Sequence, residues 1–167
     1  QFSVIDMEGR PIAYVKQKAF KLKEDISVFK TESQTDLLFK ISADRWLDYN
    51  ASYSFTDDNG KECGRLVRKG ARSIWKAEYE LHNEAGKQGL LIQEDNPWVR
   101  VADHFLGEIP ILGMLTGYFF NPSFNITRPD GTQVATFYKK PDLVSRVFDL
   151  EKNAGFEEGE ETRLVLG

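Results

Sequence analysis

Paired basic residues end several extended stretches of this chain, and their type and spacing indicate a binding chemistry. Arg68 and Lys69 follow an acidic turn, as do Lys139 and Lys140. A looser version begins at Asp6 and ends at Lys16 and Lys18. Each lysine or arginine near an anionic membrane contributes on the order of 1 kcal/mol to binding. The candidate residues for binding anionic headgroups are Lys16, Lys18, Lys21, Lys23, Arg68, Lys69, Arg72, Lys139 and Lys140.

Catalytic and metal-binding patterns are missing from the sequence. His82, His104 and Cys63 stand alone, without the spacing of a zinc site. The segment FTDDNG resembles a calcium loop, but Phe55 occupies the first ligand position and Leu66 the position of the bidentate glutamate. No serine lies in a nucleophile elbow, and the glycines form no phosphate-binding loop. We therefore expect a protein that is not an enzyme and that uses neither a metal ion nor a cofactor.

The composition is that of one folded domain. The chain has 167 residues, which suits a single domain over residues 1–167, and its aromatic share of 13% is enough for a packed core. Its net charge of -4 argues against a general affinity for nucleic acid. Much of the excess acid lies in the segment FEEGEE near the C-terminus, so the remainder of the domain is nearly neutral and is compatible with local basic patches.

The cysteine content and the hydropathy of the chain indicate its cellular compartment. Cys63 is the single cysteine, so no intramolecular disulfide forms, and no signal-peptide pattern opens the chain. The longest apolar stretch begins at Phe105, contains Glu108 and Pro110, and is shorter than the roughly 20 residues of a membrane span. We expect a cytoplasmic, monomeric protein that contacts membranes only peripherally.

Side chains alternating with a period of two dominate the chain and predict β-strands. In the segment WLDYNASYSF every second residue from Leu47 to Phe55 is apolar, which is typical of a strand with one buried face. The following DDNG supplies turn residues and GRLVRK resumes the extended pattern, so these segments form a hairpin. Similar hairpins are indicated around Gly9, residues 86–89 and Gly131, and a glycine-free one begins at Ile26. The repeated hairpins predict an all-β sandwich or barrel.

Residues 99–117 break this pattern, because their apolar residues do not alternate cleanly. Short helices fit the stretch, with Pro110 near a helix start. Such helices would form either a membrane-inserting loop or a plug against the sheet. Apolar stretches of this length usually belong to a core.

The hairpins also predict a domain with an acidic end and a basic end. In a meander the turns lie at one end of the sheet, and the next strands finish at the other. Neighbouring bases on one strand point to opposite faces, so a pair such as Arg68 and Lys69 belongs at a rim, where the strand is ending. The hairpin around Gly86 ends in QED instead, so the rule is partial. Acids that favour turns and lysines that solubilise strand ends would give the same pattern without a binding site.

Three long stretches resemble a known family. They begin YVKQKAFKL at Tyr14, KISADRWLDY at Lys40 and NPWVRVADHF at Asn96. They resemble the LURP-one-related group of the tubby C-terminal-like superfamily, which also contains the phospholipid scramblases. The resemblance implies a closed antiparallel β-barrel of about twelve strands around a central hydrophobic helix, and closure would remove exposed sheet edges. Tubby relatives bind phosphoinositide headgroups and scramblase-like relatives move lipids, whereas LURP-one-related members have no well-defined activity.

The C-terminal segment departs from what the resemblance implies. The family's central helix is C-terminal, and EEGEETRLVLG resembles only its first turns, with glutamates that complement the helix dipole. We expect this helix to be absent or truncated, the segment after Gly155 to turn inward, and Leu164 and Leu166 to be buried. A barrel without its filling helix leaves a costly void. Residues 105–120 or an apolar ligand are the alternative fillers.

The sequence leaves functions of three classes open. The leading one is a non-enzymatic module that docks anionic phospholipid or phosphoinositide headgroups at the basic rim and does not bind nucleic acid. The second is a carrier that holds an apolar small molecule in the barrel interior. The third is a protein-interaction scaffold that uses the exposed sheet.

Overall fold

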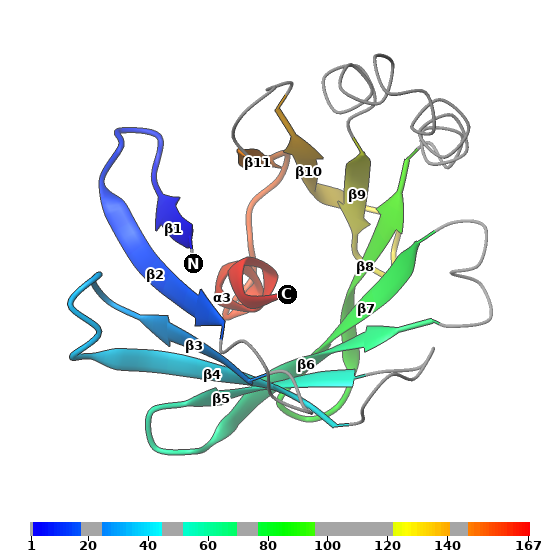
Figure 1. Cartoon of the computed structure of the whole chain (residues 1–167). Helices are drawn as coiled ribbons and strands as arrows, with labels where there is room; N and C mark the ends of the chain where they lie inside the picture. The colour runs from blue at the N-terminus through cyan, green and yellow to red at the C-terminus, as the bar shows by residue number, and fades with distance from the viewer. Residues whose placement is uncertain (1, 18–24, 45–51, 70–76, 96–121, 141–146) are drawn as a thin grey trace, which may run out of the picture.

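A computed structural model describes residues 2–17, 25–44, 52–69, 77–95, 122–140 and 147–167. These residues form eleven strands in one antiparallel sheet, ordered as they follow one another in the chain (Figure 1). The strands are β1 (Phe2–Ile5), β2 (Pro11–Gln17), β3 (Asp25–Phe29), β4 (Leu37–Ala43), β5 (Ser52–Asp57), β6 (Glu62–Arg68), β7 (Glu78–Asn83), β8 (Gln88–Glu94), β9 (Ser123–Thr127), β10 (Gln133–Lys139) and β11 (Phe148–Lys152). A short helix, α3 (Glu160–Leu166), follows the last strand.

The aspartate, asparagine and glycine residues between the strands form tight turns. At the β5–β6 turn the Asp57 carboxylate accepts hydrogen bonds from the backbone N–H groups of Asn59 and Lys61, at 3.0 and 2.8 Å. The next residue after Asn59 is a glycine with a positive φ, a conformation that residues with a Cβ rarely adopt. Glycines with positive φ stand in the corresponding places of three further turns, at Gly9, Gly86 and Gly131.

The meander gives the sheet two different ends. The connections β1–β2, β3–β4, β5–β6, β7–β8 and β9–β10 lie at one end, which we call the turn end. The connections β2–β3, β4–β5, β6–β7, β8–β9 and β10–β11 lie at the opposite end, which we call the rim end. Every strand therefore runs between the turn end and the rim end.

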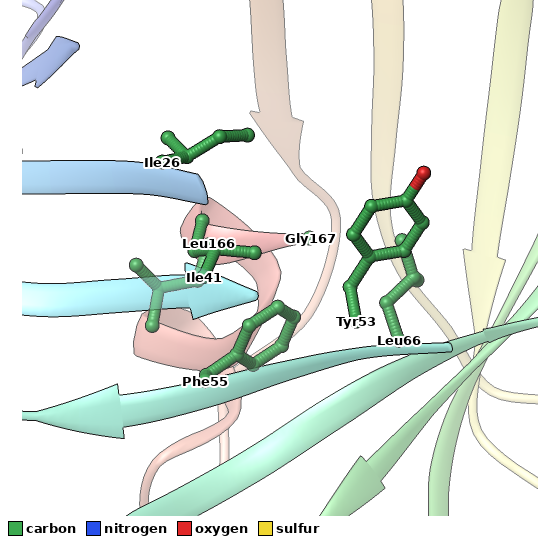
Figure 2. Close-up of a pocket in the computed structure, with 7 residues that line it drawn as sticks. All are labelled: Ile26, Ile41, Tyr53, Phe55, Leu66, Leu166 and Gly167. Atoms are coloured by element: carbon green, nitrogen blue, oxygen red, sulfur yellow. The ribbon is translucent and has the colours of Figure 1, made fainter. Parts of the chain in front are cut away.

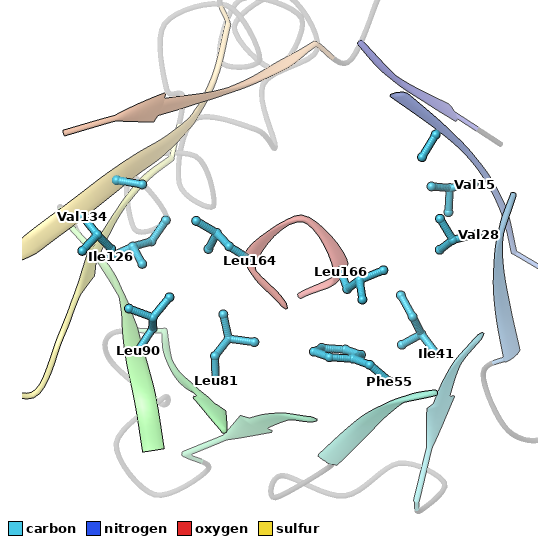
Figure 3. Packing of buried hydrophobic residues seen from close by; sticks show 12 residues of the cluster. Val15, Val28, Ile41, Phe55, Leu81, Leu90, Ile126, Val134, Leu164 and Leu166 are labelled. Atoms are coloured by element: carbon cyan, nitrogen blue, oxygen red, sulfur yellow. The ribbon is translucent and has the colours of Figure 1, made fainter. Parts of the chain in front are cut away.

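Helix α3 lies in the hollow of the curved sheet (Figure 1). Leu164 and Leu166 are buried and join a core cluster that includes Phe55, Leu81 and Leu90. Figure 3 shows Leu164 on the side of β7, β8 and β9, and Leu166 on the side of β4 and β5. The predicted inward turn of the C-terminal segment and the burial of both leucines are confirmed.

A bidentate ion pair anchors the start of α3. Arg128 at the turn end donates from Nε to Glu160 Oε1 at 3.0 Å and from Nη2 to Glu160 Oε2 at 2.7 Å. The same guanidinium donates to the carbonyl oxygen of Gly155 at 2.7 Å. The hydrogen bonds from Arg128 to the carboxylate lower the pKa of Glu160 below its ordinary value, and the carboxylate is buried. The charge therefore stays on Glu160 inside the domain, where it is matched by Arg128.

A close approach between α3 and β6 depends on Gly64. A Cβ at this position would lie 2.5 Å from the carbonyl oxygen of His82 and 2.8 Å from Cδ of Arg163. Its φ of 149° is also one that side chains disfavour. Only glycine lets the helix and the neighbouring strand come this close.

The mainly β, antiparallel architecture is confirmed, but the predicted closed barrel of about twelve strands is not. The eleven strands form a continuous sheet from β1 to β11, and among the described residues no hydrogen-bonded pairing joins β1 to β11. The C-terminal helix is present as a seven-residue segment. The helices predicted over residues 99–117 lie outside the described residues. No helix in the described ranges is long and apolar enough to cross a membrane.

Replacement of Glu160 tests the anchor of α3. We expect Glu160→Ala to lower the free energy of unfolding by about 2 kcal/mol, because it removes the anion that matches the Arg128 guanidinium. Glu161 is exposed in the same helical turn, so Glu161→Ala serves as the control and should leave stability nearly unchanged. Urea denaturation followed by circular dichroism measures both. Equal midpoints for the two variants would contradict the assignment of Glu160 as an anchor.

Candidate functional site

The described members of the predicted basic site belong to the rim end. Arg68 is the last residue of β6 and Lys139 the last residue of β10, and Lys69 and Lys140 follow them directly. Lys16 lies one residue before the end of β2. Lys18, Lys21, Lys23 and Arg72 lie outside the described residues.

The bases are spread around the rim end. Three strands separate β2 from β6, and three separate β6 from β10. At about 4.8 Å between neighbouring strands, the bases of β6 and β10 are about 19 Å apart along the sheet. No single headgroup spans that distance, so these residues form a distributed surface.

The two bases at the end of β6 lie on opposite faces of the sheet. Leu66 lines the interior, and Arg68 shares its face because alternate residues of a strand point the same way. Lys69 pairs with Glu80, which is the cross-strand partner of outward-facing Val67. Arg68 therefore faces the interior and Lys69 the outside.

On the outer face Lys69, Glu80 and His82 form a network. Lys69 Nζ lies 2.9 Å from Glu80 Oε1, and His82 Nε2 lies 2.9 Å from Glu80 Oε2. Burial alone would raise the pKa of Glu80, but the hydrogen bonds from His82 and Lys69 outweigh it and lower the pKa. Glu80 is therefore anionic at neutral pH and neutralises Lys69.

Two further predicted bases also have polar partners. Lys140 Nζ lies 2.8 Å from Asp149 Oδ2, and this hydrogen bond raises the pKa of Lys140 above its ordinary value. Lys16 Nζ donates to Gln34 Oε1 at 2.7 Å, and Gln34 belongs to the β3–β4 connection at the turn end. The Lys16 ammonium is thus directed away from the rim end. Sequence reasoning missed the acidic partners, because they become neighbours only through strand register.

The interior holds an apolar cavity beside the end of α3 (Figure 2). Its volume is about 210 Å³. A cavity of about 150 Å³ with similar apolar walls is large enough to bind benzene. The lining residues are Ile26, Ile41, Tyr53, Phe55, Leu66, Leu166 and Gly167. The cavity thus lies between the end of α3 and the inner faces of β3 to β6.

Two inward-facing polar side chains mark the rim end of this interior. Arg68 Nε is buried and has no hydrogen-bond partner in the ranges that the structure describes. Glu94, the last residue of β8, is 0% exposed, and its Oε2 accepts a hydrogen bond from the Ala77 N–H at 3.2 Å. Sequence reasoning missed Glu94, although its alternation with Leu90 and Ile92 places it on the inner face.

The comparison with protein families matches residues 11–158 to the LURP-one-related family model. The chain belongs to the LURP-one-related family. The matched range covers β2 to β11 of this LURP-one-related chain and ends just before α3. No significant match was found among curated proteins or among solved structures. The predicted family is confirmed, and the family description states no activity.

The outer network predicts a pH dependence of stability. The pKa of Glu80 in the folded chain lies below its ordinary 4.5, so its stabilising contribution is present above that pH and is lost as pH falls through the lowered value. We expect Glu80→Gln to cost about 1 kcal/mol of unfolding free energy at neutral pH and almost nothing in strong acid. Urea denaturation of both proteins over this pH range measures the difference.

Glu84→Gln is the matched control, because Glu84 forms an exposed ion pair with Lys61 at the turn end. We expect this variant to match the wild type at every pH. A Glu80→Gln deficit that stays constant into strong acid would contradict an ionic contribution from Glu80.

Proposed function

We propose that this LURP-one-related domain is a non-enzymatic module that docks on anionic phospholipid surfaces through its rim end. The observation that carries the proposal is the collection of Lys69, Lys139 and Lys140 at one end of the meander. The spacing of about 19 Å between β6 and β10 suits an extended membrane surface better than a single headgroup. Docking on a surface needs no enzymatic group and no inserted helix.

The ion pairs at the rim end set the expected strength of this docking. The side chains of Lys69 and Lys140 are 40% and 51% exposed, although Glu80 and Asp149 neutralise them. Exposed ion pairs contribute little net free energy, so lipid phosphates compete with these carboxylates for the ammonium groups. Binding is therefore weak. It fades as salt rises, because the screening length is only about 8 Å at physiological ionic strength.

A carrier of apolar small molecules is the second candidate function. The cavity of about 210 Å³ beside α3 favours it, since its walls are apolar and lie inside the sheet. Membrane docking uses the rim end and ligand carriage uses the interior, so each can be tested without the other.

Neutralising the rim end should abolish membrane binding. We expect the triple variant Lys69→Gln, Lys139→Gln and Lys140→Gln to lose sedimentation with liposomes containing phosphatidylserine and phosphoinositides at low salt. Arg68 is kept, because its Nε is buried. The triple variant Lys30→Gln, Lys61→Gln and Lys87→Gln removes the same charge at the turn end and should still sediment. Wild-type protein that ignores these liposomes at low salt would refute the proposal.

Removing the competing acids should have the opposite effect. We expect Glu80→Gln combined with Asp149→Asn to strengthen sedimentation several-fold, because it releases Lys69 and Lys140 from their ion pairs. Asp58→Asn combined with Glu84→Gln makes the same change of net charge at the turn end. Equal strengthening by both double variants would show that net charge, and not the rim end, controls binding.

A further inference from the structure

The Glu80 carboxylate is shared by two basic side chains on the outer face of the sheet. Its Oε1 lies 2.9 Å from Nζ of Lys69 at the rim end, and its Oε2 lies 2.9 Å from Nε2 of His82, two residues further along β7. The side chains of Lys69 and His82 are 40% and 21% exposed, so both are open to solvent. One acid therefore serves a base that can contact a membrane and a base that can take up a proton.

The charge of this network depends on the protonation of His82. Imidazole is the side chain whose charge ordinarily changes between about pH 5 and about pH 8. While the ring is neutral, the charges of Lys69 and Glu80 cancel. Burial opposes ionisation of Glu80, but the hydrogen bonds from His82 and Lys69 outweigh it and keep the pKa of Glu80 below its ordinary 4.5, so the carboxylate stays charged over this range. Protonation of His82 therefore leaves two positive charges against one negative charge.

The described neighbours of His82 leave Glu80 as the acid that balances its proton. Across β6 the ring faces Arg65, whose guanidinium is matched by Glu62 at 2.7 Å. On β8 the register partner of His82 is the uncharged Gln88. A proton on His82 is thus balanced by Glu80, at the expense of the lysine on the other carboxylate oxygen.

We propose that His82 is a proton-dependent switch that strengthens docking of the rim end on anionic phospholipid surfaces as pH falls. The inference rests on the membrane docking proposed above and names how that site is regulated. A protonated His82 holds Glu80 by a charge-assisted hydrogen bond, which is stronger than the bond to a neutral ring. Lys69 is then no longer neutralised, and its ammonium is available to lipid phosphates.

The neighbouring polar pairs at the rim end contain no histidine in the part of the chain that the structure describes. Lys140 lies 2.8 Å from Asp149. Glu78, the next acid on the outer face of β7, accepts a hydrogen bond from Gln93 at 2.8 Å. The switch therefore acts on Lys69. One released base near an anionic membrane contributes about 1 kcal/mol, which is about a fivefold change in affinity.

Sedimentation with phosphatidylglycerol vesicles at about pH 8 and about pH 5.5 tests the switch. This lipid keeps its phosphodiester charge over the whole range, so a change in binding reports on the protein. We expect the wild type to bind about fivefold more tightly at the lower pH and to ignore phosphatidylcholine vesicles at both. Equal binding at both pH values would overturn the switch alone. No binding at either pH would overturn membrane docking and the switch together.

The two histidines of the chain allow a matched comparison. His82→Gln keeps a side chain that can donate to Glu80 but cannot take up a proton, so it should bind equally at both pH values. His104→Gln should keep the fivefold response. A response that survives in His82→Gln, or that disappears in His104→Gln alone, would overturn the assignment to His82.

Two lysine variants test whether the proton acts through Lys69. Lys69→Gln and Lys140→Gln each remove one paired base from the rim end, and both should weaken binding. Lys69→Gln should also lose the difference between the two pH values, because its ammonium is the group that Glu80 releases, whereas Lys140→Gln should keep it. Circular dichroism spectra that match the wild type show that the variants fold. Equal pH responses in the two variants would overturn the coupling through Glu80.

Discussion

The ion pair between Arg128 and Glu160 is the interaction on which the interior of this domain depends. Isolated helices shorter than about 12–15 residues are marginal in water, and α3 has only seven. Its helical form must therefore come from its surroundings. The bidentate contact fixes its first residue to the sheet, and burial of Leu164 and Leu166 fixes the remainder. Without this helix, the inward face of the sheet would surround a larger void.

The topology of the sheet then decides which chemistry appears at which end. In a meander every tight turn lies at the turn end, where glycines and turn carboxylates are favoured. Even-numbered strands finish at the rim end, where the alternation still places neighbouring residues on opposite faces but the strand is ending. Two adjacent bases are tolerated there, one on each face, as Arg68 and Lys69 show. The ends of the domain differ because of strand order, and no separate element is needed to create the difference.

Local patterns in the sequence predicted much of this architecture. The turn at Asp57 and the alternation up to Phe55 depend on residues close in sequence, so hairpins and the buried face could be read directly. Contacts across the fold could not. Arg128 and Glu160 are 32 residues apart, and their pairing depends on where α3 enters the hollow.

The neutralisation of the predicted bases depended on register. Whether Lys69 meets an acid depends on which residue of β7 lies beside the end of β6, and a slip of one residue would turn Glu80 inward. The size of the cavity depends on how much of the hollow the leucines of α3 occupy. Local sequence patterns do not show such packing volumes. The sequence therefore predicted where the bases lie along their strands, but not that acidic side chains neutralise them.

The backbone at the end of β6 keeps the two kinds of basic residue apart. The Lys69 N–H donates to the carbonyl oxygen of Glu78 at 3.0 Å, so β6 and β7 remain joined beyond the last ladder residue. The bond extends the ladder to Lys69, so the alternation of faces holds for both residues. Arg68 therefore points inward and Lys69 outward. Adjacent bases at the rim end therefore act in separate environments, one screened by acids and solvent and the other held beside an apolar space. Net charge at this end is a poor guide to binding, since the exposed base is already paired while the inward one is not.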